Sequence, residues 1–104
     1  MSGVGEFVRV ISAGEVPFGE GRAVEAAGRR IAVFNTKDGW FALDDLCPHA
    51  GGSLGEGHVA AGCVACPLHF WEFDLRTGEY TDDPDTRVQT YEVKVEGGDV
   101  LVRV

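Results

Sequence analysis

The sequence predicts an all-β protein built from antiparallel sheets, and three observations support that prediction. Polar and apolar residues alternate in several short runs, which is the two-residue period of a half-buried strand. The chain has 15 glycines and 4 prolines, and many of them fall between those runs, as turn residues do. No segment shows a convincing helical period. Short strands joined by tight turns are typical of an all-β fold with antiparallel sheets.

The first half of the chain is predicted to form one strand and two hairpins. A loop rich in Gly and Pro follows the first strand. Ala27-Gly28 is a plausible hairpin turn, and Asp38-Gly39 is a stronger one because both residues tolerate positive φ. The predicted strands are residues 6–11, 22–26, 29–35 and 40–43.

The second half is predicted to end in the best hairpin of the chain, with its turn at Gly97-Gly98. An earlier turn is expected at Arg76-Thr77-Gly78. Residues 82–85 are expected to be loop, because Pro84 cannot donate a hydrogen bond to a strand ladder. The predicted strands are residues 70–75, 79–81, 89–95 and 99–104.

The charge balance narrows the class of partner. The chain has 104 residues, with 9 Lys and Arg against 17 Asp and Glu, a formal charge of −8 and a pI near 4.7. This acidity argues against a nucleic-acid backbone or an anionic membrane as partner. A protein with a basic docking patch fits better, although acidity also serves plain solubility. We see no membrane-length apolar run and no secretory signal, so a cytoplasmic location is expected.

Two short motifs predict a metal site. Cys47-Pro48-His49 is followed, after sixteen residues, by Cys66-Pro67-Leu68-His69. These motifs use two of the three cysteines and two of the three histidines in the chain. Glycines crowd into the region between positions 44 and 69, which suits loops that approach a bound group closely.

The ligand types alone leave two kinds of metal centre open. A tetrahedral Cys2His2 zinc site is one, but such sites usually take a Cys-x2–4-Cys pair from a single knuckle. Here each motif supplies one Cys and one His. That division fits a [2Fe–2S] cluster with two thiolates on one iron and two imidazoles on the other better than a mononuclear site. A structural zinc module remains the less favoured alternative.

The two motifs, followed by an aromatic-rich segment and Asp74-Leu75-Arg76-Thr77-Gly78, resemble the Rieske iron–sulfur family. The resemblance extends through nearly the whole chain. It implies a single Rieske domain over residues 1–104, a small antiparallel β-sandwich in which a cluster-binding subdomain of about residues 45–75 is inserted in a basal β subdomain. The length of the chain resembles that of a stand-alone Rieske ferredoxin or of a nitrite reductase small subunit.

The resemblance also implies the ligands of one Rieske-type [2Fe–2S] cluster. Cys47 and Cys66 would bind the inner iron, and His49 and His69 the outer, more exposed iron. No catalytic residue is implied, so the chain is expected to be an electron-transfer component and not an enzyme.

Several positions depart from the pattern of the respiratory branch of this family. Those relatives carry a disulfide at the positions of Gly52 and Leu68, so no such bridge is possible here. They also place Ser and Tyr hydroxyls at the positions of Trp71 and Phe73. Without those hydrogen-bond donors, the reduction potential is expected near the low end of the family range of about −150 to +300 mV. Most relatives also have Gly where this chain has Phe70.

Three other residues are weighed on their own. Cys63 is expected to be a small buried residue without a thiol partner. His58 is expected to be a solvent-facing loop histidine and not a proton-linked group. Pro84 resembles the proline of a loop that covers the cluster in this family, and a simple turn is nearly as well supported.

The resemblance implies a soluble one-electron carrier. It would accept electrons from a reductase and pass them to a terminal oxygenase, with docking centred on His49 and His69 and surrounded by Pro48, Leu68 and Phe70. The alternative is the small subunit of an assimilatory nitrite reductase, whose large subunit would be the acceptor.

Overall fold

The computed structural model describes residues 5–49 and 51–104. Within these residues the chain forms twelve strands and two short 3-10 helices, so the prediction of an all-β antiparallel fold is confirmed. The strands are β1 (Phe7–Ser12), β2 (Glu20–Ala26), β3 (Arg29–Thr36), β4 (Gly39–Asp44), β5 (His58–Ala60), β6 (Cys63–Ala65), β7 (Glu72–Asp74), β8 (Glu79–Tyr80), β9 (Asp83–Arg87), β10 (Thr90–Tyr91), β11 (Val93–Glu96) and β12 (Asp99–Arg103). The helices are η1 (Ala13–Glu15) and η2 (Leu54–Glu56).

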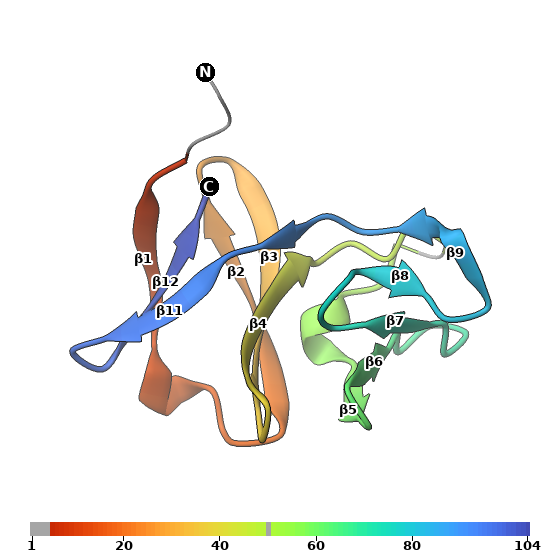
Figure 1. The fold of residues 1–104 in the computed structure, drawn as a ribbon, viewed down its shortest axis with the longest axis horizontal. Helices are drawn as coiled ribbons and strands as arrows, with labels where there is room; N and C mark the ends of the chain where they lie inside the picture. The colour runs from red at the N-terminus through yellow and green to blue at the C-terminus, as the bar shows by residue number, and fades with distance from the viewer. Residues whose placement is uncertain (1–4, 50) are drawn as a thin grey trace.

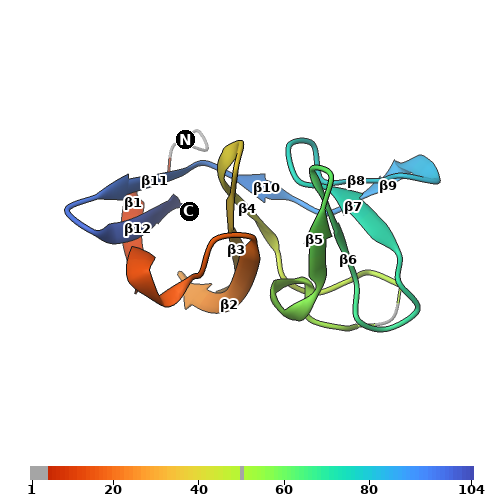
Figure 2. The ribbon, with the colours of Figure 1, turned by 90° about the horizontal axis from the view of Figure 1, so that it is seen from below.

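The strands form two parts that lie side by side (Figure 1). One part combines the sheet β1-β12-β11 with the sheet β10-β4-β3-β2, and the other is the sheet β5-β6-β7-β8-β9. The chain leaves the first part after β4, builds the whole five-stranded sheet, and returns at β10, as Figure 2 also shows. The five-stranded sheet and the segment that leads into it therefore carry both predicted metal-binding motifs.

Strand β3 separates two hydrophobic cores. Its central residues are apolar and fully buried on both faces, which explains the unbroken apolar run in the sequence. Ile31 and Val33 face a core shared with β12, whereas Ala32 and Phe34 face a second core under the five-stranded sheet. Both predicted cysteine ligands belong to this second core.

The predicted hairpin turns are largely confirmed. Ala27 and Gly28 have φ of 53° and 76°, and Gly97 and Gly98 have φ of 58° and 85°, as the two positions of a type I′ turn require. The turn predicted at Asp38-Gly39 is displaced by one residue, because Gly39 already pairs with Thr36 in the ladder of β3 and β4.

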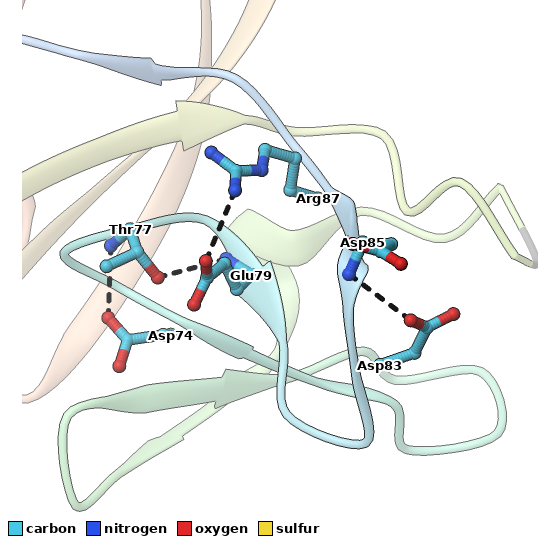
Figure 3. Close-up of polar contacts among 6 residues, drawn as sticks. All are labelled: Asp74, Thr77, Glu79, Asp83, Asp85 and Arg87. Atoms are coloured by element: carbon cyan, nitrogen blue, oxygen red, sulfur yellow. Dashed lines mark hydrogen bonds and ion pairs between the residues drawn. The ribbon is translucent and has the colours of Figure 1, made fainter.

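The prediction that residues 82–85 are loop is wrong, because β9 covers Asp83–Arg87. Strand β9 lies at the edge of its sheet, where a proline with no N–H to donate is tolerated. An ion pair of 3.2 Å joins Arg87 Nη2 to Glu79 Oε2 across the strand pair, and the Asp85 N–H donates to Asp83 Oδ1 (Figure 3). The sequence around Pro84 predicted an interruption of the strand, but an edge strand can contain a proline.

Two further strand predictions need correction. Residues 89–95 do not form one strand: β10 pairs with β4, and after Glu92 the chain continues as β11, which pairs with β12 in the other sheet. The hairpin of β5 and β6 was not predicted, because the glycines around it indicated a loop. Its turn, Ala61-Gly62, has φ of 53° and 79°.

Candidate metal centre

The first predicted ligand loop lies between β4 and η2. Cys47 is buried, with 1% of its surface exposed, and His49 is exposed. The backbone closes around the cysteine: the Cys47 N–H donates to the Gly52 carbonyl over 2.9 Å, and the Gly51 N–H donates to the Cys47 carbonyl over 2.8 Å. Loop closure therefore fixes the cysteine inside the core and leaves the histidine at the surface.

The second predicted ligand loop, between β6 and β7, closes with the same hydrogen-bond pattern. The Cys66 N–H donates to the Trp71 carbonyl over 2.8 Å, and the Phe70 N–H donates to the Cys66 carbonyl over 3.1 Å. In both loops the partners stand five and four residues after the cysteine. Phe70 is therefore the counterpart of Gly51, and both have left-handed φ, 60° and 74°. The backbone thus explains why glycine suits position 70.

The two sulfur atoms lie together in the second core. Burial raises the pKa of the Cys66 thiol, and so does the neighbouring Cys47, whereas hydrogen bonds from the backbone of Leu68 and Gly52 act in the opposite direction. A Cβ atom at Gly52 would lie only 2.9 Å from Cys66 Sγ, so the backbone at Gly52 packs directly against this sulfur. Two adjacent buried thiolates repel each other, and bound metal cations would offset that repulsion.

The two imidazoles form a second pair at the surface. The ring centroids of His49 and His69 are 5.3 Å apart, and the ring planes meet at 74°. His69 also has a left-handed φ of 69°, next to that of Phe70. The structure therefore brings all four predicted ligands into two pairs, one of buried sulfurs and one of exposed imidazoles.

This arrangement bears on which metal centre the residues fit. Within residues 5–49 and 51–104, no three His, Cys, Asp or Glu side chains converge closely enough to hold one metal ion between them. Separate sulfur and imidazole pairs suit a two-iron cluster, in which each iron takes one kind of ligand.

Trp71 contacts the surface pair directly. Its indole stacks on the His49 ring with centroids 3.9 Å apart and planes at 5°, and it also stacks on Tyr80 at 4.0 Å and 2°. Sequence reasoning treated Trp71 only as a position that lacks a hydroxyl donor. The aromatic-rich segment was visible in the sequence, but the partners of the stack come from three different segments.

Asp45 is a second residue that sequence reasoning missed. Its side chain is fully buried, and Oδ1 accepts hydrogen bonds from Ser53 Oγ at 2.9 Å and from the Gly55 N–H at 2.7 Å. Its Oδ2 lies 2.9 Å from Arg30 Nε. These contacts join the two ends of the first ligand loop. Nothing in the sequence distinguishes Asp45 from the neighbouring Asp44.

Three other residues were singled out from the sequence: Cys63, His58 and Pro84. None of them belongs to the two ligand loops. Cys63 is half-buried in β6 and free of disulfide bonding, and the pKa of its thiol is raised by burial and by Asp74 and Glu72. His58 is exposed as predicted, but it lies in β5 and not in a loop. Pro84 is an exposed residue of β9, neither a covering loop nor a simple turn.

Among the described residues, no helix is long and apolar enough to cross a membrane.

The chain is similar over most of its length to ferredoxins of dioxygenase systems. It is 38% identical to the biphenyl dioxygenase ferredoxin subunit of Pseudomonas sp. (strain KKS102), over 92% of this chain and 90% of that protein. It is 44% identical to the anthranilate 1,2-dioxygenase ferredoxin subunit of Burkholderia cepacia, over 79% and 78%.

Solved structures give the same fold. The ferredoxin of carbazole 1,9a-dioxygenase from Nocardioides aromaticivorans IC177 matches with a TM-score of 0.84 and 33% identity, over 93% of this chain and 96% of that one. A ferredoxin in a complex of reduced oxygenase and oxidized ferredoxin of carbazole 1,9a-dioxygenase matches at 0.81 and 30%, over 93% and 92%. A putative NADH-dependent nitrite reductase small subunit from Mycobacterium tuberculosis matches at 0.88 and 25%, over 97% of both chains.

The Rieske [2Fe-2S] domain family matches residues 6–92, a span that includes both ligand loops and all of the five-stranded sheet. This match agrees with the two relatives and with the pairing of buried sulfurs and exposed imidazoles. The chain therefore belongs to the Rieske [2Fe–2S] family.

Proposed function

We propose that this protein is a Rieske ferredoxin, a one-electron carrier that takes electrons from a reductase and delivers them to a terminal oxygenase. The observation that carries this proposal is the pair of exposed imidazoles above a pair of buried thiols. The ferredoxin subunits to which the chain is 38% and 44% identical support it. The carrier is assigned to the cytoplasm and has no catalytic role of its own.

In this proposal Cys47 and Cys66 hold the inner iron, and His49 and His69 hold the outer iron. The bound cluster supplies a one-electron redox couple. The chain contributes a dry environment around the two sulfurs and backbone hydrogen bonds from Gly52 and Leu68 to the Cys66 sulfur. These hydrogen bonds favour the charged form of the sulfur.

The absence of hydroxyl donors affects the expected potential. Trp71 and Phe73 occupy the positions where respiratory relatives place Ser and Tyr, and Phe73 is fully buried. The Tyr80 hydroxyl donates to Asp82 Oδ2 at 3.3 Å, so it is engaged elsewhere. A low reduction potential within the range of about −150 to +300 mV is the consequence that we propose.

The docking face surrounds the two imidazoles. Leu68 is 48% exposed and Phe70 is 74% exposed, and Pro48 is also exposed. A small apolar face of this kind suits a transient redox complex with fast release. The charge of −8 adds long-range attraction to a partner with a basic docking patch.

A second candidate is the small subunit of an assimilatory nitrite reductase. The structural likeness to a putative subunit of that class, at a TM-score of 0.88, supports it. The identity of 25% is lower than that to the dioxygenase ferredoxins. Stable co-purification with a large sirohaem-bearing chain would favour this candidate, whereas turnover of an oxygenase by the free protein favours the ferredoxin.

The test of the ligand set uses matched pairs of variants. The purified wild-type protein should be coloured and should give a rhombic EPR signal after one-electron reduction. Cys66→Ser and His69→Ala should lose that signal, whereas Cys63→Ser and His58→Ala should keep it. A colourless wild-type protein, or a signal that survives in Cys66→Ser, would contradict the proposal.

We also propose that residues 1–104 form a single Rieske domain, with the ligand loops in a cluster-binding subdomain of about residues 45–75. Limited proteolysis of the holoprotein should then give no stable fragment that retains the colour without the strands of the basal part.

A further inference from the structure

We propose that Trp71 is a positioning residue that fixes the imidazole of His49 and joins the two ligand loops to each other. This inference rests on the proposed function, because it takes His49 as a ligand of the outer iron. It concerns side-chain contacts that follow from the packing of this chain.

The backbone and the side chain of Trp71 serve different loops. Its carbonyl accepts the hydrogen bond of 2.8 Å from the Cys66 N–H and so closes the second loop. Its indole stacks on His49, which belongs to the first loop, with centroids 3.9 Å apart and planes at 5°. One residue therefore spans the gap between the loops, where this chain has Gly52 and Leu68 and can form no disulfide.

The Trp71 indole also packs against Tyr80. Tyr80 stacks on it at 4.0 Å and 2°, and two rings at such distances cannot share one face, so His49 and Tyr80 lie on opposite faces of Trp71. Tyr80 in turn pairs with the fully buried Phe73 across β7 and β8, with ring centroids 5.7 Å apart. The stack thus runs from the core to a surface imidazole.

The two imidazoles are supported unequally. His49 has a parallel aromatic partner, whereas among the described residues His69 makes an aromatic contact only with the edge of His49. The stack restricts the plane of the His49 ring, because a ring that lies parallel to an indole at 3.9 Å cannot tilt without clashing with it or losing contact. Fixing the plane of His49 also fixes the edge that it turns toward His69.

The test compares four variants in the reduced holoprotein. Trp71→Leu keeps apolar volume but removes the stacking ring, Trp71→Phe keeps a ring, and Tyr80→Leu removes the support behind it. Trp40→Phe is the matched control, because it alters the other tryptophan, which packs against the basal core. Circular dichroism confirms that each variant is folded.

The first readout is EPR with the nitrogen hyperfine couplings of the two imidazoles. We expect Trp71→Leu to broaden the signal and change the coupling of one imidazole, with a smaller change in Tyr80→Leu and almost none in Trp71→Phe or Trp40→Phe. The second readout is loss of visible absorbance in a chelator, which we expect to be about 10- to 100-fold faster in Trp71→Leu, as for other residues that orient metal ligands.

Two outcomes overturn the inference. One is a folded Trp71→Leu protein with wild-type couplings and a wild-type rate of cluster loss. The other is a Trp71→Phe protein as impaired as Trp71→Leu, because stacking would then not be the relevant contact. Failure of the proposed function is distinguishable, since the wild-type protein itself would then show no cluster.

Discussion

Replacing Asp45 with Asn should destabilise the protein by about 2–3 kcal/mol, because this carboxylate closes the first ligand loop. The substitution keeps the shape of the side chain but removes the negative charge from a fully buried site. Two hydrogen bonds, from Ser53 Oγ and the Gly55 N–H, then lose their charged acceptor. Hydrogen bonds to charged groups contribute about 1.5–3 kcal/mol each, and the remaining amide oxygen retains part of that.

The ion pair between Asp45 and Arg30 contributes less to the stability of the protein than its short distance suggests. Breaking a fully buried pair costs about 3–5 kcal/mol, but the Arg30 side chain is 56% exposed and regains water when its partner is neutral. Loss of this ion pair therefore contributes much less than that to the destabilisation. Asp45→Ala removes Oδ1, the acceptor of both hydrogen bonds, and should therefore cost more than Asp45→Asn.

The assay is urea unfolding of the holoprotein followed by circular dichroism and by visible absorbance. With a slope of about 1–3 kcal/mol per molar urea, the loss lowers the midpoint by about 0.7–3 M. Glu96→Gln is the control, because its ion pair with Lys94 is exposed on both sides and should contribute less than about 1 kcal/mol. A midpoint for Asp45→Asn within the range of this control would refute the reasoning.

Three further experiments test other features of the structure. Phe70→Gly should stabilise the protein by about 0.5–1 kcal/mol in urea unfolding, because it relieves the left-handed φ of 60°. The control Phe18→Gly should not stabilise it, because Phe18 is similarly exposed but does not have a left-handed φ. Burial raises the pKa of the Cys63 thiol, so iodoacetamide should label it more slowly at pH 8 than an exposed model thiol, and a rate equal to that of the model thiol would count against its burial. The pKa of Tyr91 is raised by burial and by donation to Asp44, so the folded state holds this proton above the unfolded pKa near 10 and stability is lost as pH rises through the folded pKa. Tyr91→Phe should flatten that loss, and an unchanged profile above pH 10 would contradict the assignment.

Local sequence patterns predicted the parts of this fold that depend on local chemistry. Alternation indicated β12, and the paired glycines at Gly97-Gly98 indicated the turn before it, since both effects act within a few residues. Residue types and spacing predicted a metal site, and the resemblance to the Rieske family implied its ligand set. The structure places those four side chains in two pairs, and their roles as ligands are a prediction that the matched variants test.

Features that depend on residues distant in sequence could not be predicted from local patterns. Strand β9 contains Pro84 and acidic residues, and only its place at a sheet edge makes a strand possible there. Asp45 is buried because Ser53, Gly55 and Arg30 surround it, and none of the three is adjacent in sequence. The stack on Trp71 likewise joins three segments. Pairings of this kind are set by the tertiary fold and leave no local pattern.

Phe70 does not follow the preference for glycine at a left-handed position. The two ligand loops close with the same pair of backbone hydrogen bonds, and the first loop satisfies the left-handed position with Gly51. The second loop places a phenylalanine there, at a conformational cost of about 1–2 kcal/mol for an L-residue. The Phe70 side chain is 74% exposed, so its packing within the chain offsets little of this conformational cost. A residue that is unfavourable in the free protein and lies beside His69 is best explained by contacts made in a complex. Phe70→Gly should therefore be more stable than the wild type and a poorer electron donor to the oxygenase that we propose as acceptor, with an unchanged reduction potential.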